Sequence, residues 1–97
     1  MNDLKGLMDW YQSNCDGDWE HIYGIKITTL DNPGWSFCAN ILETKLEGRS
    51  FFEESIENDD DWYSLNCDGE IFKGYCSPNK LDFVIDKFVK FAQSKIT

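Results

Sequence analysis

The chain has 97 residues, 18 of them acidic and 9 basic, with a formal net charge of −9 at pH 7. This length suits one modest core, so we expect a single domain over residues 1–97. The negative charge repels phosphate groups and anionic lipid, which argues against direct binding to nucleic acid or membranes and favours a basic protein partner. Because 41% of the residues are hydrophobic and 15% aromatic, an ordered fold is expected.

The N-terminus and the cysteines narrow the class of protein further. No basic segment precedes an apolar one, and no apolar run approaches the roughly 18 residues of a membrane span, so we expect a cytoplasmic protein. Cys15, Cys38, Cys67 and Cys76 include no C-x-x-C pair, and the chain has 1 His. The sequence therefore predicts no metal site and no cofactor, and the thiols should be reduced and partly buried.

The first expected element is a helix. Asn2 or Asp3 can cap it, and it should end before the pair Asp16-Gly17. Apolar residues recur at i, i+3, i+4 and i+7. The resulting stripe consists of Leu4, Leu7, Met8 and Tyr11.

A β-hairpin should follow, with strands over residues 22–30 and 35–43. Pro33 and Gly34 stand in the order that a type II turn requires. Such a turn leaves apolar residues on both faces: Tyr23, Ile25, Ile27, Cys38 and Leu42 on one, and Leu30, Trp35, Phe37, Ala39 and Ile41 on the other. Helices could cover both faces, a bulge could shift one strand, or one face could be kept apolar for a partner.

Three more strands are expected after a turn at residues 47–49. The first is a short strand over residues 51–58, with Phe52 and Ile56 on one face. Strands over residues 62–67 and 70–76 flank Asp68-Gly69, a strong signal for a two-residue hairpin turn. This turn would pair Leu65 with Phe72 and Tyr63 with Gly74 on the core side, and Trp62 with Tyr75 and Ser64 with Lys73 on the other.

The last expected element is an amphipathic helix. Ser77 followed by Pro78, or Asn79 with Asp82, can cap it. Its apolar stripe is Leu81, Ile85, Phe88, Ala92 and Ile96, widened by Val84 and Phe91, and its polar side holds Asp82, Asp86, Lys87, Lys90 and Lys95. The order of elements predicts an α+β fold with an N-terminal helix, a five-stranded meandering antiparallel sheet and a C-terminal amphipathic helix.

The acidic residues Asp16, Asp18 and Glu20 alternate along the chain, as the first ligands of a calcium loop do. The comparison fails because Gly17 is the second residue of the segment rather than the sixth, and Ile27 occupies the twelfth position where a Glu is needed. The pattern is that of an Asp-Gly turn with solvated carboxylates.

The only histidine offers an alternative function. His21 could act as a general base together with Glu20, and Cys15 could serve as a nucleophile, which would make the protein a small enzyme. No nucleophile elbow and no glycine-rich phosphate loop supports this hypothesis.

An acidic run before Trp62 points instead to protein binding. The run consists of Glu53, Glu54, Glu57, Asp59, Asp60 and Asp61. It can serve solubility alone, or it can steer a basic protein such as a nuclease. Trp and Tyr often anchor interfaces, so the run with Trp62 and Tyr75 is the first candidate binding surface. The second consists of Asp16, Asp18, Glu20 and His21.

The chain resembles the Immunity protein 53 family of bacterial polymorphic toxin systems. The resemblance rests on W-Y…C-D-G-D-W-E-H (residues 10–21), G-I-K-I-x-T-L-D-N-P-G-W (24–35) and D-D-W (60–62). It implies a non-enzymatic protein that binds and neutralises a cognate toxin domain. Because inhibitory surfaces diversify with their toxins, a motif shared by the family favours a scaffold role for residues 10–35. A module that self-associates through the apolar hairpin face is a further alternative, and a monomer and a small homo-oligomer both remain open.

Overall fold

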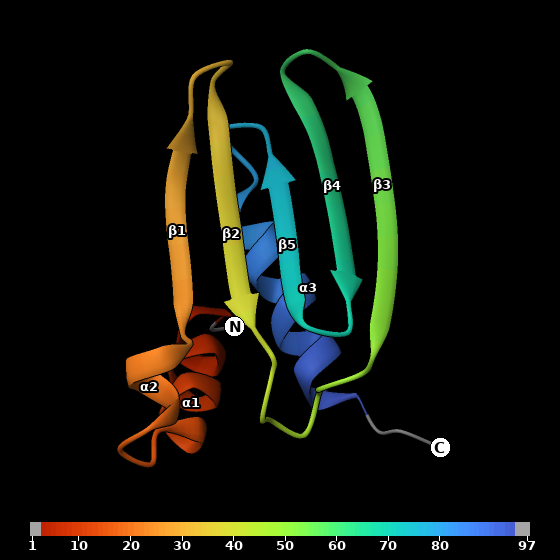
Figure 1. The fold of residues 1–97 in the computed structure, drawn as a ribbon. Coiled ribbons are helices and arrows are strands. Elements are labelled where there is room, and N and C mark those ends of the chain that lie inside the picture. Colours follow the sequence, from red (N-terminus) through yellow and green to blue (C-terminus); the bar gives the residue numbers. More distant parts are fainter. Residues whose placement is uncertain (1–2, 95–97) are drawn as a thin grey trace.

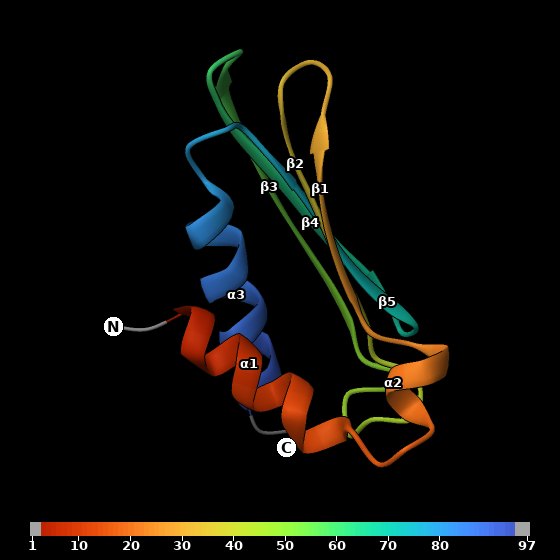
Figure 2. The same cartoon turned by 90° about the vertical axis from the view of Figure 1, so that its left-hand side faces the viewer.

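A computed structural model describes residues 3–94, in which two helices pack on one face of a five-stranded antiparallel sheet (Figures 1 and 2). The helices are α1 (Asp3–Asn14), the short α2 (Trp19–Ile22) and α3 (Leu81–Gln93). The strands are β1 (Ile25–Leu30), β2 (Gly34–Asn40), β3 (Ser50–Asn58), β4 (Asp61–Asp68) and β5 (Ile71–Cys76). The expected α+β fold with an N-terminal and a C-terminal helix is confirmed.

The strand order is β1-β2-β5-β4-β3, so the expected meander is correct only from β3 to β5. After β2 the chain crosses to the far edge of the sheet, and β5 returns to the middle beside β2 (Figure 1). β5 suits the centre because Phe72 and Cys76 are fully buried. The edge strand β3 instead carries charged residues, including Glu53 and Glu54.

The β1–β2 hairpin turns over three residues, with Leu30 paired with Gly34. The expected turn centred on Pro33-Gly34 is therefore wrong, and so are the two expected faces. Side chains alternate along a strand, so a change of one residue in the turn exchanges faces. The side covered by helices holds Ile25, Ile27, Trp35, Phe37 and Ala39, which leaves the other side of this hairpin largely polar.

A short helix replaces the expected beginning of the first strand. Trp19 in α2 is 3% exposed, and its indole N–H donates a hydrogen bond to the carbonyl oxygen of Leu42 at 3.0 Å. β2 also ends earlier than expected, at Asn40, because the Asn40 side chain accepts a hydrogen bond from the Leu42 amide at 3.1 Å. Glu43 then adopts a left-handed conformation with φ of 61°, which ends the extended chain.

The register of the β4–β5 hairpin differs from the expected one by two residues. Leu65 pairs with Gly74, because the Asp68 carboxylate accepts hydrogen bonds from the amides of Glu70 and Ile71 and the turn lies one residue later. An even shift preserves the faces, so Leu65 does face the core, but Trp62 and Tyr75 are not a direct pair. β3, expected to be short, has 9 residues.

The core lies between the sheet and α3. Val84, Ile85, Phe88 and Phe91 of the expected stripe are buried, and the Phe88 ring lies 5.0 Å from that of Phe72. Neither expected cap is present: Lys80 precedes α3 without a side-chain cap, and Ser77 is fully buried elsewhere. Ile96 and Lys95 lie outside the described residues.

The stripe predicted for α1 is mostly not buried. Only Leu7 is buried, whereas Leu4 is 56% and Met8 52% exposed. α1 instead packs on α3, where the Trp10 ring lies 4.9 Å from that of Phe88. Asn2 and the side chain of Asp3, which were expected to cap α1, lie outside the part of the chain that the structure describes.

The four cysteines are free. Cys67 and Cys76 are buried and Cys38 is half-buried, as expected for thiols that pack as small apolar groups, and burial raises the pKa of Cys76 to about 11. Cys15 is exposed, contrary to that expectation. Within residues 3–94, no helix is long and apolar enough to cross a membrane.

Candidate functional site

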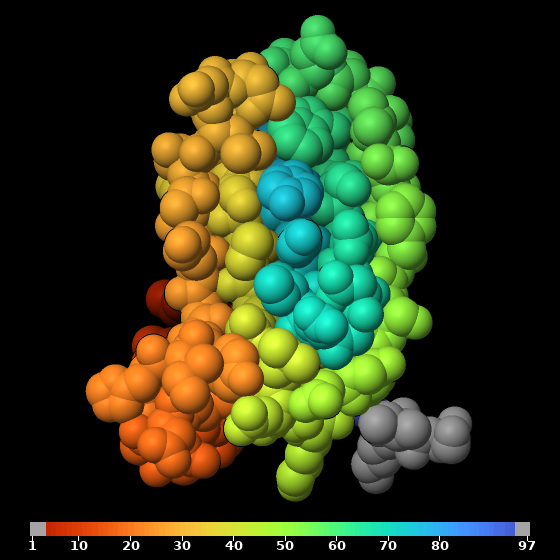
Figure 3. Space-filling model, viewed as in Figure 1, coloured from red at the N-terminus to blue at the C-terminus, as the bar shows by residue number. Residues whose placement is uncertain are grey.

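The face of the sheet opposite the helices carries Trp62 and Tyr75. Both α1 and α3 lie on the other side of the sheet (Figure 2), and the short α2 lies beyond the end of β1 (Figure 1), so neither long helix covers this open face. Side chains from all five strands are visible on it (Figure 3). Trp62 and Tyr75 are half-buried.

An apolar row crosses one end of the open face and consists of Leu30, Gly34, Trp62 and Ile56. Leu30 pairs with Gly34, and Trp62 pairs with Ile56. A Cβ atom on Gly34 would lie 3.3 Å from Cζ2 of Trp62 and 3.4 Å from Cδ1 of Leu30, so both side chains close over this glycine. Ile56 is 67% exposed. The row therefore presents an accessible apolar surface of the kind that anchors protein interfaces.

Ser77 is fully buried directly after the end of β5 and holds the backbone of Trp62 through hydrogen bonds. The Ser77 amide donates to the carbonyl oxygen of Trp62 at 3.0 Å, and the Trp62 amide donates to Oγ of Ser77 at 3.3 Å. Oγ of Ser77 also lies 3.0 Å from Oδ1 of Asn79. These bonds fix the main chain from which the Trp62 side chain projects.

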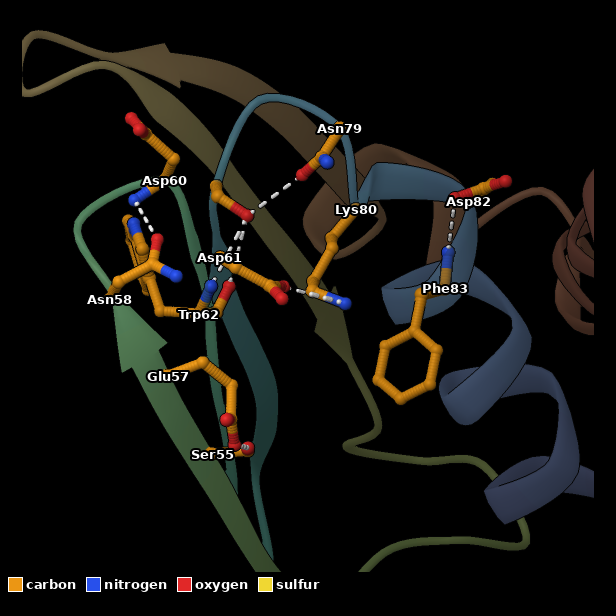
Figure 4. A network of polar contacts seen from close by, with 11 residues as sticks. Ser55, Glu57, Asn58, Asp60, Asp61, Trp62, Asn79, Lys80, Asp82 and Phe83 are labelled. Atoms are coloured by element: carbon orange, nitrogen blue, oxygen red, sulfur yellow. Dashed lines mark hydrogen bonds and ion pairs between the residues drawn. The ribbon is translucent and has the colours of Figure 1, made fainter.

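Two members of the acidic run are neutralised by lysines near or within α3. Asp61 forms an ion pair of 3.0 Å with Lys80 (Figure 4), and Glu53 forms one of 2.9 Å with Lys87. Glu53 also accepts a hydrogen bond of 2.6 Å from the hydroxyl of Tyr63. This hydrogen bond and the nearby Lys87 lower the pKa of Glu53, and the same hydrogen bond raises the pKa of Tyr63 to about 12. Glu53 and Asp61 thus join the sheet to the helix layer.

The other acidic residues are divided between the two faces and the β3–β4 turn. Glu57 lies 3.4 Å from the hydroxyl of Ser55, whose position on β3 faces the helix side. Glu54 lies on the open face, and exposed Asp59 and Asp60 form the turn. Within residues 3–94, none of Glu54, Glu57, Asp59 and Asp60 forms an ion pair.

We call the part of the first candidate set that the structure brings together the acidic–aromatic surface: Glu54, Asp59, Asp60, Trp62 and Tyr75. Glu54 pairs with Ser64, which pairs in turn with Tyr75 across β4 and β5. The Asp60 amide donates to Oδ1 of Asn58 at 2.8 Å, which shapes the turn (Figure 4). The β1–β2 turn lies at the same end of the sheet (Figure 1).

The second candidate set is used to build its own loop. Oδ1 of Asp16 accepts hydrogen bonds of 3.0 Å from the amides of Asp18 and Trp19. Glu20 reaches back to the amides of Asp16 and Gly17, at 3.0 and 2.8 Å. The Trp19 amide lowers the pKa of Asp16, and the amides of Glu20 itself, Asp16 and Gly17 lower that of Glu20. This reciprocal pattern orders the turn into α2, as a capping box does.

His21 and Asp18 are exposed at this loop, at the opposite end of the sheet from the β3–β4 turn (Figure 1). Cys15 donates a hydrogen bond to the carbonyl oxygen of Tyr11 at 3.3 Å. In the part of the chain that the structure describes, His21 bonds to neither Glu20 nor Cys15, and no cluster of His, Cys, Asp or Glu could hold a metal ion.

The comparison with known families decides the class of protein. The model described as Immunity protein 53 matches residues 4–93. The chain belongs to the Immunity protein 53 family. No curated protein and no solved structure matches it. The resemblance found in the three sequence motifs is therefore confirmed, and membership of the Immunity protein 53 family implies a toxin as the partner.

Three residues beside the acidic–aromatic surface of this Immunity protein 53 chain were missed by sequence reasoning. Leu30 was expected on the same face as Trp35, and Gly34 was expected in the turn, because the hairpin turn was placed one residue away from its actual position. Ile56 was placed on a face with Phe52 but not recognised as accessible, although both are more than two-thirds exposed, at 67% and 70%. An Ile between Glu54 and Glu57, within the acidic run, was the signal available in the sequence.

Proposed function

We propose that this chain acts in the cytoplasm as a single domain that binds a cognate toxin and neutralises it by stoichiometric protein–protein inhibition. We further propose that the acidic–aromatic surface and the adjoining apolar row make the contact. The family supports the toxin as partner. The observation that carries the choice of surface is a sheet face that neither α1 nor α3 covers, where Trp62 and Ile56 lie beside carboxylates that form no ion pair within residues 3–94.

The two parts of this surface have different roles in the proposal. Carboxylates at the rim attract a basic toxin domain and raise its rate of association, an effect that salt screens. The apolar row, with Trp62 at its centre, supplies the desolvated contact that slows dissociation. A stable complex buries about 1,200–2,000 Å² in total, so the toxin must also cover neighbouring parts of the open face.

The test is copurification and kinetic measurement of binding with the toxin encoded beside this chain. Trp62→Ala should weaken binding by about 2 kcal/mol or more, which is about thirtyfold in Kd. The double variant Asp59→Asn/Asp60→Asn should mainly lower the association rate, and its difference from wild type should shrink as salt reduces the Debye length from about 10 Å at 0.1 M to about 3 Å at 1 M.

A matched control removes the same charge from the other end of the sheet. The double variant Asp16→Asn/Asp18→Asn changes residues of the second candidate set. Its association rate should be close to that of a second double variant, Asp9→Asn/Asp18→Asn, which changes the net charge equally. Circular dichroism of each variant shows whether the fold is retained. If the Asp16 variant loses binding while the Asp59 variant keeps it, the second candidate set is the interface. If no complex with the toxin forms, the proposed function is wrong.

A further inference from the structure

The two edges of the sheet are protected against strand pairing to different degrees. β3 carries three glutamates and an irregular register between Ile56 and Asn58. β1, with the sequence IKITTL, carries one charge at Lys26, has no Pro, and pairs with β2 in a regular register. Edge strands are normally guarded by charges, bulges or Pro. β1 therefore has little of this protection, and its outer edge is suited to pairing with another strand.

The backbone groups available at this edge follow from one hydrogen bond. The Asn40 amide donates to the carbonyl oxygen of Gly24 at 3.0 Å, so Gly24 faces β2. Antiparallel strands alternate, so the N–H and C=O groups of Ile25, Ile27 and Thr29 point away from β2. Figure 2 views the molecule from this side, and no described element crosses the outer edge of β1.

We propose that β1 pairs antiparallel with β1 of a second copy of this chain, about a two-fold axis at Ile27. Ile27 then lies opposite Ile27 of the second copy, and Ile25 lies opposite its Thr29. This register uses all the outward groups, forming three hydrogen-bonded pairs with about six hydrogen bonds. It also keeps the helix-covered faces of both sheets on one side, because paired residues share a face.

Charge favours a second copy over the toxin as the occupant of this edge. Two chains with a net charge of −9 repel each other overall, but the segment over residues 21–30, where they would meet, contains no acidic residue. Its single charge, Lys26, would face Thr28 of the second copy, so no like charges are directly opposed. A basic toxin domain, in contrast, is attracted to the β3–β4 turn, at the other edge of the sheet.

Apolar side chains beside β1 add contact area. Ile27 is 39% and Ile22 69% exposed. A pocket of 1040 Å³ adjoins the beginning of the strand and is lined from both faces of the sheet, by Tyr11 and Ile25 as well as by Lys26 and Cys38. In the proposed register, Ile27 and Thr29 of the second copy are presented on the same side of the extended sheet as Ile25, next to this pocket.

Sedimentation of the full chain at increasing concentration, without toxin, tests the pairing. Wild type should change from monomer to dimer. Ile27→Lys places two like charges opposite each other at the axis, and should weaken the dimer at least about tenfold. Ile27→Glu should do the same. An equimolar mixture of the two variants should restore a dimer, because only a two-fold register that opposes residue 27 with itself joins Lys to Glu.

Ile56→Lys on the other edge strand is the matched control, and should dimerise as wild type does. A wild type that remains monomeric at every concentration overturns the proposal, as does a mixture that stays monomeric when both variants retain the native circular dichroism. The Ile27→Lys monomer should still bind toxin. If this variant loses toxin binding, β1 contacts the toxin instead. If wild type and every variant fail to bind toxin, the proposed function is wrong, and the pairing of β1 is not affected by that result.

Discussion

Replacing Gly34 by Ala should destabilise the protein, because this position is closed on three sides. Its backbone is not in the left-handed region, so Ala can adopt the conformation. An added Cβ, however, would overlap the carbonyl oxygen of Cys76 on β5 and lie 3.3 Å from Cζ2 of Trp62. The Trp62 ring can shift slightly. The carbonyl cannot, because Cys76 is fully buried in the central strand and pairs with Trp35.

The magnitude follows from two opposing effects. Overpacking at a site that cannot relax costs about 1–3 kcal/mol, and Ala recovers about 0.4–1 kcal/mol by restricting the unfolded chain. At the middle of both ranges the expected net loss is about 1.3 kcal/mol. In a domain of this size each kcal/mol lowers the melting temperature by about 4–8 °C, so the decrease should be roughly 5–10 °C.

Urea unfolding followed by tryptophan fluorescence measures this loss. Ser36→Ala is the matched control, because Ser36 lies two residues further along β2 on the same face and its substitution adds no atom. Its free energy of unfolding should stay within about 0.5 kcal/mol of wild type. A Gly34→Ala variant as stable as the control would refute the close packing of Trp62 and Cys76 around Gly34.

Two further predictions concern contacts outside the apolar row. The pKa of Glu53 is lowered from its ordinary value of 4.5, so its contact with Tyr63 stabilises the fold above pH 4.5, and this stabilisation is lost as the pH falls through the folded pKa. The pKa of Tyr63 is raised, so the stabilisation from this group is complete below pH 10.0 and is lost as the pH rises through about 12. Tyr63→Phe should therefore cost about 1 kcal/mol near neutral pH and less at either extreme in urea titrations, and a pH-independent difference would contradict the contact. Asp16→Ala should lower the melting temperature in calorimetry without weakening toxin binding, since Asp16 orders the loop before Trp19; an unchanged melting temperature argues against that role.

The candidate site was predictable where residue chemistry alone decides. Trp62, Tyr75 and the acidic turn stand out in the sequence because indole, phenol and carboxylate groups have recognisable roles at interfaces. The division of the acidic run was not predictable. Glu53 and Asp61 are neutralised by Lys87 and Lys80, which lie 34 and 19 residues further along the chain. Only the packing of α3 against β3 and β4 brings these charges together.

The sequence by itself determined the kinds and order of the main elements. Period-2 and period-3.6 patterns are local, so the two long helices and five strands can be read from neighbouring residues. The tertiary structure alone decided which faces meet. A one-residue difference in the β1–β2 turn moves the side chains of one strand to the opposite face relative to the other strand. The insertion of β5 between β2 and β4 likewise depends on burying Phe72 under α3, a long-range gain that no local pattern records.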